Sequence, residues 1–135
     1  MIYIIDTNVI SSVRRPERAP DVAAWLQSKP ENSLYLSVIT LGEIERGIKL
    51  REKREPDFAH DLQVWLNYTV TMFSDRILPF SAEDALIWGQ LSAELGHADA
   101  DLMIAAQALS RDGIIVTRNV SDFAPTGVRL ENPFA

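Results

Sequence analysis

The feature of the sequence that most constrains the fold is a set of short apolar runs. Between these runs lie stretches in which apolar residues recur at helical spacing. Residues 2–5 and 114–117 form the clearest runs, and residues 34–38 form another. Strands without polar alternation are typical of a parallel sheet that helices cover on both faces. The pattern therefore predicts an α/β fold, a three-layer α/β/α sandwich with a mostly parallel central sheet.

Two weaker runs, residues 77–80 and 128–130, predict a further short strand and a last edge strand. The chain has 135 residues, of which 47% are hydrophobic, so we expect one domain over residues 1–135 with a core of its own. In open α/β sheets the functional groups gather beyond the carboxyl ends of the strands. Candidate site residues are therefore those that directly follow the strands or begin the next helices.

The composition excludes several kinds of site. The chain has no cysteine, which excludes disulfides, thiolate zinc sites, iron–sulfur clusters and a cysteine nucleophile. It has only two histidines, too few for a multi-histidine metal site. The N-terminus lacks the basic start of a signal peptide, and no stretch approaches the ~18–20 apolar residues of a membrane span. We expect a soluble, cytoplasmic protein that makes no membrane contact.

Acidic and basic residues are segregated along the chain. The net charge of −6 by itself argues against a nucleic-acid partner. However, residues 77–110 contain no Lys or Arg, whereas residues 46–54 contain five. The mean charge is therefore a poor guide to the partners of this protein.

Acidic residues stand where the first two strands end. Asp6 directly follows the first strand, and a carboxylate there costs free energy unless a partner compensates its charge. An alternative is that Asp6 or Asn8 merely caps a short helix. Glu43 lies early in a helix that Thr40 is predicted to open, and this pair also fits a capping box without any function.

Further polar residues lie near the last two predicted helix and strand boundaries. Asp101 precedes an almost wholly apolar helix, and Asp99 lies two residues earlier. Their alternative role is to favour the helix start, as a first-turn acid and an N-cap. Thr117, Asn119 and Asp122 follow the strand near residue 115 and are equally typical of an ordinary turn.

Together, these carboxylates predict a cation. Carboxylates that converge at one edge of a sheet repel one another unless a cation lies between them. Oxygen ligands without Cys or His favour a hard ion, so we expect Mg²⁺ or Mn²⁺ rather than zinc. Such a site is suited to the activation of water for phosphodiester hydrolysis.

Four blocks of the sequence resemble the PIN-domain family and, within it, the VapC toxins of type II toxin–antitoxin pairs, with the FitB-like subgroup the nearest. The blocks are IIDTNVIS at residues 4–11, LSVITLGEIERGI at 36–48, DLMIAAQAL at 101–109 and IIVTRNVSDF at 114–123. The resemblance covers nearly the whole chain and implies a small Mg²⁺-dependent endoribonuclease.

The resemblance also implies which residues form the site. Asp6, Glu43 and Asp101 match three acids of the family. Some members carry the fourth acid where Asn119 stands, and others three residues later, which here is Asp122. We therefore expect Asp6 and Asp101 to hold the principal metal, and Glu43 and Asp122 to orient a second metal or its waters.

Four other polar residues match supporting positions or lie beside them. These are Asn8, Thr117, Asn119 and the unassigned acid Asp99.

RNA affinity requires basic residues near this acidic site. The candidates for phosphate contacts are Arg14, Arg15, Arg18, Arg46 and Lys49. The residues from 46 onward have an equally open alternative role as a solvated helix face, since acidic residues lie among them.

The resemblance implies protein partners as well. It predicts a VapB-like antitoxin, a homodimer and a hetero-oligomer of the two proteins. Two rival functions remain. One is a catalytically degenerate PIN-like module that binds a protein or RNA without cleavage. The other is aspartyl-phosphate chemistry at Asp6, which is disfavoured because Asn8 stands where phosphatases carry a second acid and no lysine follows Lys53.

Overall fold

The computed structural model describes residues 1–134, and within them five strands form one parallel sheet in the order β3-β2-β1-β4-β5. The strands are β1 (Tyr3–Ile5), β2 (Leu34–Ser37), β3 (Ile77–Leu78), β4 (Ile114–Val116) and β5 (Arg129–Glu131). The chain builds the sheet outward from β1 to β3, then crosses to the other side of β1 for β4 and β5. The switch point between β1 and β4 is where α/β sheets place their sites.

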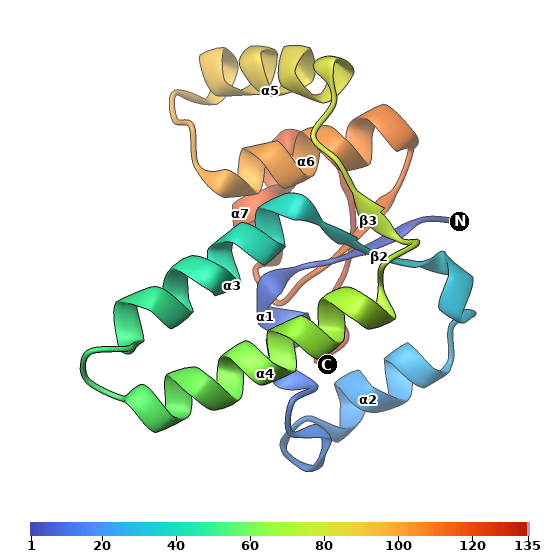
Figure 1. Cartoon of the computed structure of the whole chain (residues 1–135). Coiled ribbons are helices and arrows are strands. Elements are labelled where there is room, and N and C mark those ends of the chain that lie inside the picture. The colour runs from blue at the N-terminus through green and yellow to red at the C-terminus, as the bar shows by residue number, and fades with distance from the viewer. Residues whose placement is uncertain (135) are drawn as a thin grey trace.

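Helices cover both faces of this sheet, which confirms the predicted three layers (Figure 1). The helices of residues 1–134 are α1 (Thr7–Ser12), α2 (Pro20–Gln27), α3 (Val38–Arg51), α4 (Pro56–Met72), α5 (Ala82–Leu95), α6 (Ala100–Arg111) and α7 (Val120–Phe123). Helices α1 to α4 share one apolar cluster with Tyr3 and Ile5, whereas α5 to α7 share the other with Ile4. Successive side chains of β1 point to opposite faces of the sheet, so this strand contributes residues to both apolar clusters.

Helix α3 begins earlier than the sequence predicts. Its N-cap is Ser37, the last residue of β2, whose hydroxyl accepts a hydrogen bond from the Ile39 backbone at 3.0 Å. Thr40 is fully buried inside the helix, so the predicted capping box of Thr40 and Glu43 is wrong. Ser and Thr are both favoured N-caps, and here the strand runs into the helix without a loop, which makes Ser37 the cap. Glu43 therefore has no capping role.

Helix α6 is buried almost all round, as its apolar sequence predicts. Asp99 occupies its N-cap position without a side-chain cap hydrogen bond, and Asp101 lies in its first turn. The helix ends at Arg111, its C-cap Asp112 takes the left-handed conformation with φ 52°, and Gly113 follows next to Ile2 of the first strand's segment. A Cβ at Gly113 would lie 3.3 Å from the Ile2 carbonyl oxygen, so a larger residue would push β4 a few tenths of an ångström away from β1.

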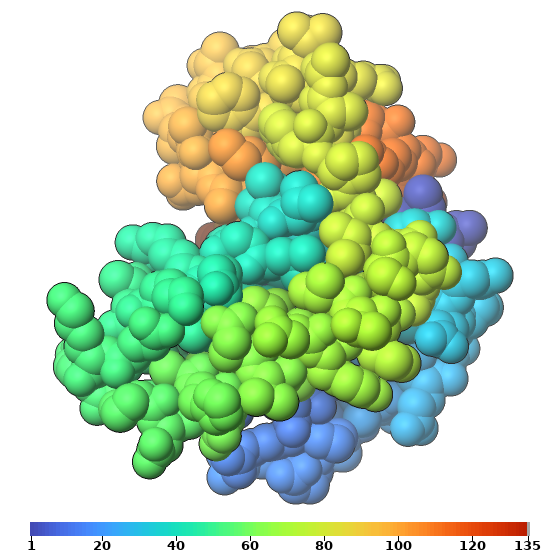
Figure 2. Space-filling view, in the orientation of Figure 1, coloured from blue at the N-terminus to red at the C-terminus, as the bar shows by residue number. Residues whose placement is uncertain are grey.

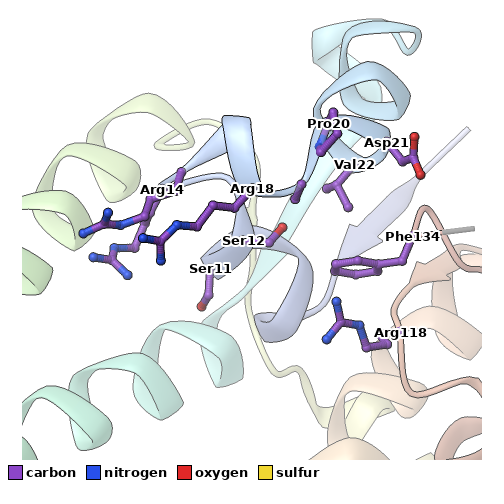
Figure 3. A pocket seen from close by; sticks show the side chains of 11 residues that line it. Ser11, Ser12, Arg14, Arg18, Pro20, Asp21, Val22, Arg118 and Phe134 are labelled. Atoms are coloured by element: carbon purple, nitrogen blue, oxygen red, sulfur yellow. The ribbon is translucent and has the colours of Figure 1, made fainter.

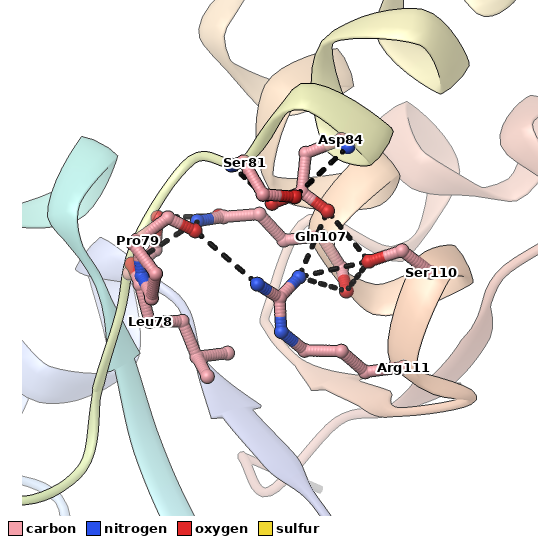
Figure 4. Close-up of polar contacts among 8 residues, drawn as sticks. Leu78, Pro79, Ser81, Asp84, Gln107, Ser110 and Arg111 are labelled. Atoms are coloured by element: carbon pink, nitrogen blue, oxygen red, sulfur yellow. Dashed lines mark hydrogen bonds and ion pairs between the residues drawn. The ribbon is translucent and has the colours of Figure 1, made fainter.

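A polar network holds α5 and α6 to the sheet (Figure 4). The buried Gln107 amide accepts from the Ser37 hydroxyl and donates to the carbonyls of Leu78 and Pro79. Asp84, the capping-box residue of α5, is fully buried and forms an ion pair with Arg111 at 2.9 Å. These contacts fix α6 relative to the ends of β2 and β3.

The surface is indented between α3 and the α5–α6 pair (Figure 2). Helices α3 and α4 lie side by side along one part of the face shown, and α5 and α6 form the other part. Within residues 1–134, the structure contains no helix long and apolar enough to cross a membrane.

Candidate functional site

Asp6 is held at the carboxyl end of β1 by three donors. Its side chain is 4% exposed, and it accepts from the Thr7 backbone at 2.9 Å, from Asn8 Nδ2 at 3.2 Å and from Thr117 Oγ1 at 2.7 Å. Burial raises the pKa of Asp6, the three hydrogen bonds oppose that rise, and the charge of Asp122 adds to it. The residue is both a helix N-cap and an oriented carboxylate, so capping and function do not exclude each other here.

Asn8 and Thr117 link the ends of β1 and β4. Asn8 Nδ2 lies 3.3 Å from Thr117 Oγ1, and Asn8 Oδ1 accepts from the Arg118 backbone at 3.1 Å. Thr117 is completely buried, and its hydroxyl also accepts from the Asn119 backbone at 3.0 Å. The two supporting positions expected from the sequence are thus joined directly to Asp6.

Glu43 enters the same site from α3. Its Oε1 accepts a hydrogen bond from the Thr7 hydroxyl at 3.0 Å. Loss of water around the carboxyl raises the pKa of Glu43, the Thr7 bond lowers it, and the charge of Asp6 raises it. Thr7 is not among the residues predicted from the sequence, because a threonine just after a helix cap carries no distinctive signal.

Asp101 faces the other acids from the first turn of α6. Burial raises its pKa to about 6, together with the charges of Asp6, Glu43, Asp122 and Asp99 in that order. The four carboxylates assigned to the site therefore lie near enough to one another for the other three charges to act on Asp101, although they come from four separate segments of the chain. Burial is the largest cause of the raised pKa values of Asp6, Glu43 and Asp101, and repulsion among the acids adds to it.

Asp99 and Asn119 lie at the margin of this cluster. Asp99 is exposed and lies 3.4 Å from His97, and its charge adds least to the pKa of Asp101. Asn119 is exposed at the N-cap of α7 and makes no side-chain cap hydrogen bond within the described chain. Asp122, one turn further, is the residue whose charge reaches both Asp6 and Asp101.

The donor set fits a hard divalent cation. Within residues 1–134, no three Asp, Glu or His side chains are arranged to hold a metal ion unaided. Mg²⁺ does not require such a cage, since it keeps several waters and binds through one or two carboxylates. The raised pKa values of three acids at one edge indicate negative charge that such an ion would neutralise.

The basic candidates separate into two groups. Arg14, Arg15 and Arg18 follow α1 and line one pocket. Arg46 and Lys49 lie exposed on α3, where Lys49 pairs with its helix neighbours Glu45 at 3.9 Å and Glu52 at 2.9 Å. Phosphate binding by either group stays a prediction.

The Asp101→Asn change is expected to stabilise the metal-free protein at pH 7.5 but not near pH 4. With a pKa of about 6 in the folded state and 3.8 as its ordinary value, Asp101 binds its proton more tightly when folded. The stability it contributes is complete below pH 3.8 and is lost as the pH rises through 6. After allowance for solvent screening we expect a gain of about 1 kcal/mol, measured by urea unfolding in chelator.

The matched control for this experiment is Asp57→Asn, which removes an exposed carboxylate in the first turn of α4. It is expected not to raise the unfolding midpoint. An Asp101→Asn protein with the same stability as the wild type at both pH values would contradict the electrostatic account of the cluster.

The chain is similar to proteins of one family over most of its length. The family model described as PIN domain matches residues 3–125. Toxin FitB of Neisseria gonorrhoeae is 34% identical, over 98% of this chain and 99% of that protein. Ribonuclease VapC14 of Mycobacterium tuberculosis is 36% identical, over 73% of this chain and 92% of that protein.

A solved structure gives the same result. The crystal structure of FitAcB from Neisseria gonorrhoeae contains a chain that superposes with a TM-score of 0.84, at 33% identity, with 98% of each chain covered. Sequence family and fold therefore agree.

Proposed function

Because the chain belongs to the PIN-domain family, we propose that it is an endoribonuclease that acts as the toxin of a type II toxin–antitoxin pair and depends on Mg²⁺ or Mn²⁺. The observation that carries the proposal is the meeting of four carboxylates at the switch point of the sheet, where Asp101 is held at a pKa of about 6. The resemblance to a protein named ribonuclease and to one named toxin supports the same activity.

The residues of the site have separable roles in this proposal. Asp6 and Asp101 would hold the principal cation, and Glu43 and Asp122 would orient a second cation or its waters. Thr117 positions Asp6 through its 2.7 Å hydrogen bond. When bound, the cation supplies the positive charge that activates water for attack on phosphorus and stabilises the leaving oxygen.

The hydrogen bonds of the site keep its carboxylates available. Three donors occupy Asp6, one at Oδ1 and two at Oδ2, so Oδ1 keeps a free lone pair for a cation. Thr7 fixes one oxygen of Glu43 and leaves the other unbound within the described residues. Cleavage by water produces a 3′-hydroxyl and a 5′-phosphate.

The partners expected from the sequence belong to the same proposal. Solved relatives include a FitAB complex bound to a DNA fragment, at a TM-score of 0.84 and 31% identity. By analogy, we propose a small VapB-like antitoxin as the partner of this chain, together with a homodimer and a toxin–antitoxin hetero-oligomer. A cytoplasmic location, where RNA and antitoxin are both present, completes the proposal.

Cleavage of a mixed small-RNA pool tests the activity directly. The wild-type protein is expected to cleave in Mg²⁺ or Mn²⁺, to stop in EDTA and to leave 5′-phosphate ends. An Asp101→Asn protein purified in the same way controls for a contaminating nuclease and is expected to be inactive. Calorimetry with Mn²⁺ on both proteins separates loss of metal binding from loss of cleavage.

Two other results would each identify one of the rival functions. A wild-type protein that neither binds Mn²⁺ nor cleaves RNA would be a degenerate binding module. Labelling of Asp6 by a phosphate mimic such as beryllium fluoride would instead indicate aspartyl-phosphate chemistry.

A further inference from the structure

Four arginines from distant parts of the sequence line one pocket of about 320 Å³. Arg14, Arg15 and Arg18 belong to the segment after α1, whereas Arg118 follows β4. The hydroxyls of Ser11 and Ser12 also line it. Figure 3 shows these two serines between the Arg14 and Arg18 side chains on one side and Arg118 on the other. The pocket thus combines cationic and neutral hydrogen-bond donors.

The four arginines of this arginine pocket have no direct carboxylate partner within residues 1–134. None of its four guanidinium groups forms an ion pair there. Asp21 is the one acidic residue among the lining residues, and Figure 3 shows its carboxylate pointing away from the arginines. Burial lowers the pKa of Arg14, the charges of Arg15 and Arg51 lower it further, and the charge of Asp61 opposes them in part. An anion in the pocket could therefore pair with guanidinium groups that have no carboxylate partner among the described residues.

The arginine pocket adjoins the carboxylate cluster through two segments. Arg118 directly follows Thr117, and its backbone donates to Asn8. Along α1, Ser11 lies one helical turn after Thr7, or about 6 Å along the axis. The guanidinium carbon of Arg118 lies 3.9 Å from the centre of the Phe134 ring, which also lines the pocket. A ligand can therefore span both sites.

We propose that the arginine pocket binds a backbone phosphate of the single-stranded RNA whose neighbouring phosphodiester lies at the carboxylates. This inference rests on the proposed nuclease function and deepens it. The four acids repel RNA, so affinity has to come from adjacent cations. The planar guanidinium fork matches phosphate oxygens in a bidentate geometry. An acidic protein segment would also find cations here, but only a polyanionic substrate has to occupy both neighbouring sites at once.

The test compares two double variants with the same change of charge. Arg15→Gln/Arg18→Gln removes two exposed arginines of the pocket, and Lys53→Gln/Arg54→Gln removes two exposed cations between α3 and α4. Binding of a fluorescein-labelled 12-nucleotide mixed-sequence RNA is followed by anisotropy in EDTA, so that no cleavage occurs. The pocket pair is expected to weaken binding at least about tenfold and to reduce the salt slope by about 1.4, while the control pair stays near wild type.

Each other outcome overturns the proposal in a distinguishable way. If the two double variants lose RNA affinity to the same extent, only the overall charge of the protein matters for binding. If the pocket pair binds RNA as tightly as the wild type and the wild type cleaves RNA, the pocket does not bind the RNA backbone but the proposed nuclease function is retained. Tight binding of labelled oligoglutamate that the pocket pair loses, with RNA binding intact, would assign the pocket to an acidic protein segment. A wild-type protein that neither binds nor cleaves RNA overturns both proposals.

Discussion

The Asp6→Asn protein is expected to cleave RNA at least about 100-fold more slowly than the wild type in Mg²⁺, while it keeps its fold. The amide replaces a carboxylate oxygen that a cation needs, but its shape is nearly the same. With its oxygen in the place of Oδ2, the amide still accepts from Thr117 Oγ1 and Asn8 Nδ2, so the ends of β1 and β4 remain joined, and only the bond from the Thr7 backbone is lost. Initial cleavage rates and circular dichroism measure the two halves of this prediction.

Asp75→Asn is the matched control for this change. Asp75 is an exposed acid just before β3, at the opposite edge of the parallel sheet from the carboxylates. The Asp75→Asn protein loses the same charge as the Asp6→Asn protein and is expected to cleave RNA at the wild-type rate. An Asp6→Asn protein that cleaves as fast as this control would remove Asp6 from the site.

The stability of the Asp6→Asn protein carries separate information. Burial and the charge of Asp122 raise the pKa of Asp6, so the ionised carboxylate is unfavourable in the metal-free fold. Replacement by a neutral amide relieves that repulsion, and an unfolding midpoint at or above that of the wild type is expected in EDTA. Added Mg²⁺ is expected to raise the midpoint of the wild type only, because it stabilises the state that binds it.

Sequence alone predicts the sheet and the first carboxylate well. The strand before Asp6 is uninterrupted and apolar, so its end can be located within one residue. The direction of α6, and with it the place of Asp101, follows less directly. A helix that feeds a parallel strand must end where that strand begins, so α6 starts at the carboxyl edge of the sheet. This deduction requires the knowledge that β4 lies beside β1, which depends on long-range pairing.

Other parts of the site depend on contacts that no local pattern encodes. Ser37 and Thr40 are both good helix caps, and only the absence of a loop after β2 decides between them. The bond between Thr7 and Glu43 joins residues 36 positions apart. The arginine pocket needs Arg118 and Phe134, which meet segments near the N-terminus only after the sheet has formed.

The second large effect is expected for Asp84→Ala, which should lower the free energy of unfolding by about 3 kcal/mol. Asp84 has no exposed surface, accepts from Arg111 at 2.9 Å and from the Ser110 hydroxyl, and closes the capping box with Ser81 (Figure 4). Its removal leaves the Arg111 guanidinium, itself only 19% exposed, without its carboxylate partner. Domains of this size have about 5–15 kcal/mol of stability, so the urea midpoint should fall visibly.

Glu83→Ala separates this network from the ordinary effect of an acid at a helix start. Glu83 is the exposed neighbour of Asp84 in the first turn of α5, and its loss is expected to cost at most about 0.5 kcal/mol. Equal costs for the two alanine variants would show that the ion pair with Arg111 adds nothing. An Asp84→Asn variant keeps the shape and is expected to fall between them.

The pH dependence of the Asp84 effect is opposite to that of Asp101. Burial raises the pKa of Asp84, but the bonds from Arg111, Ser110 and Ser81 outweigh it and hold the pKa below its ordinary value of 3.8. The stability it contributes is therefore present above pH 3.8 and is lost as the pH falls through the folded value. The difference between wild type and Asp84→Ala should shrink in acid, where the Asp101→Asn protein also loses its advantage. Ionised Asp84 thus stabilises the fold, whereas ionised Asp101 destabilises the metal-free fold. This division is expected because Asp84 holds α5 to α6, the helix that places Asp101 in the site.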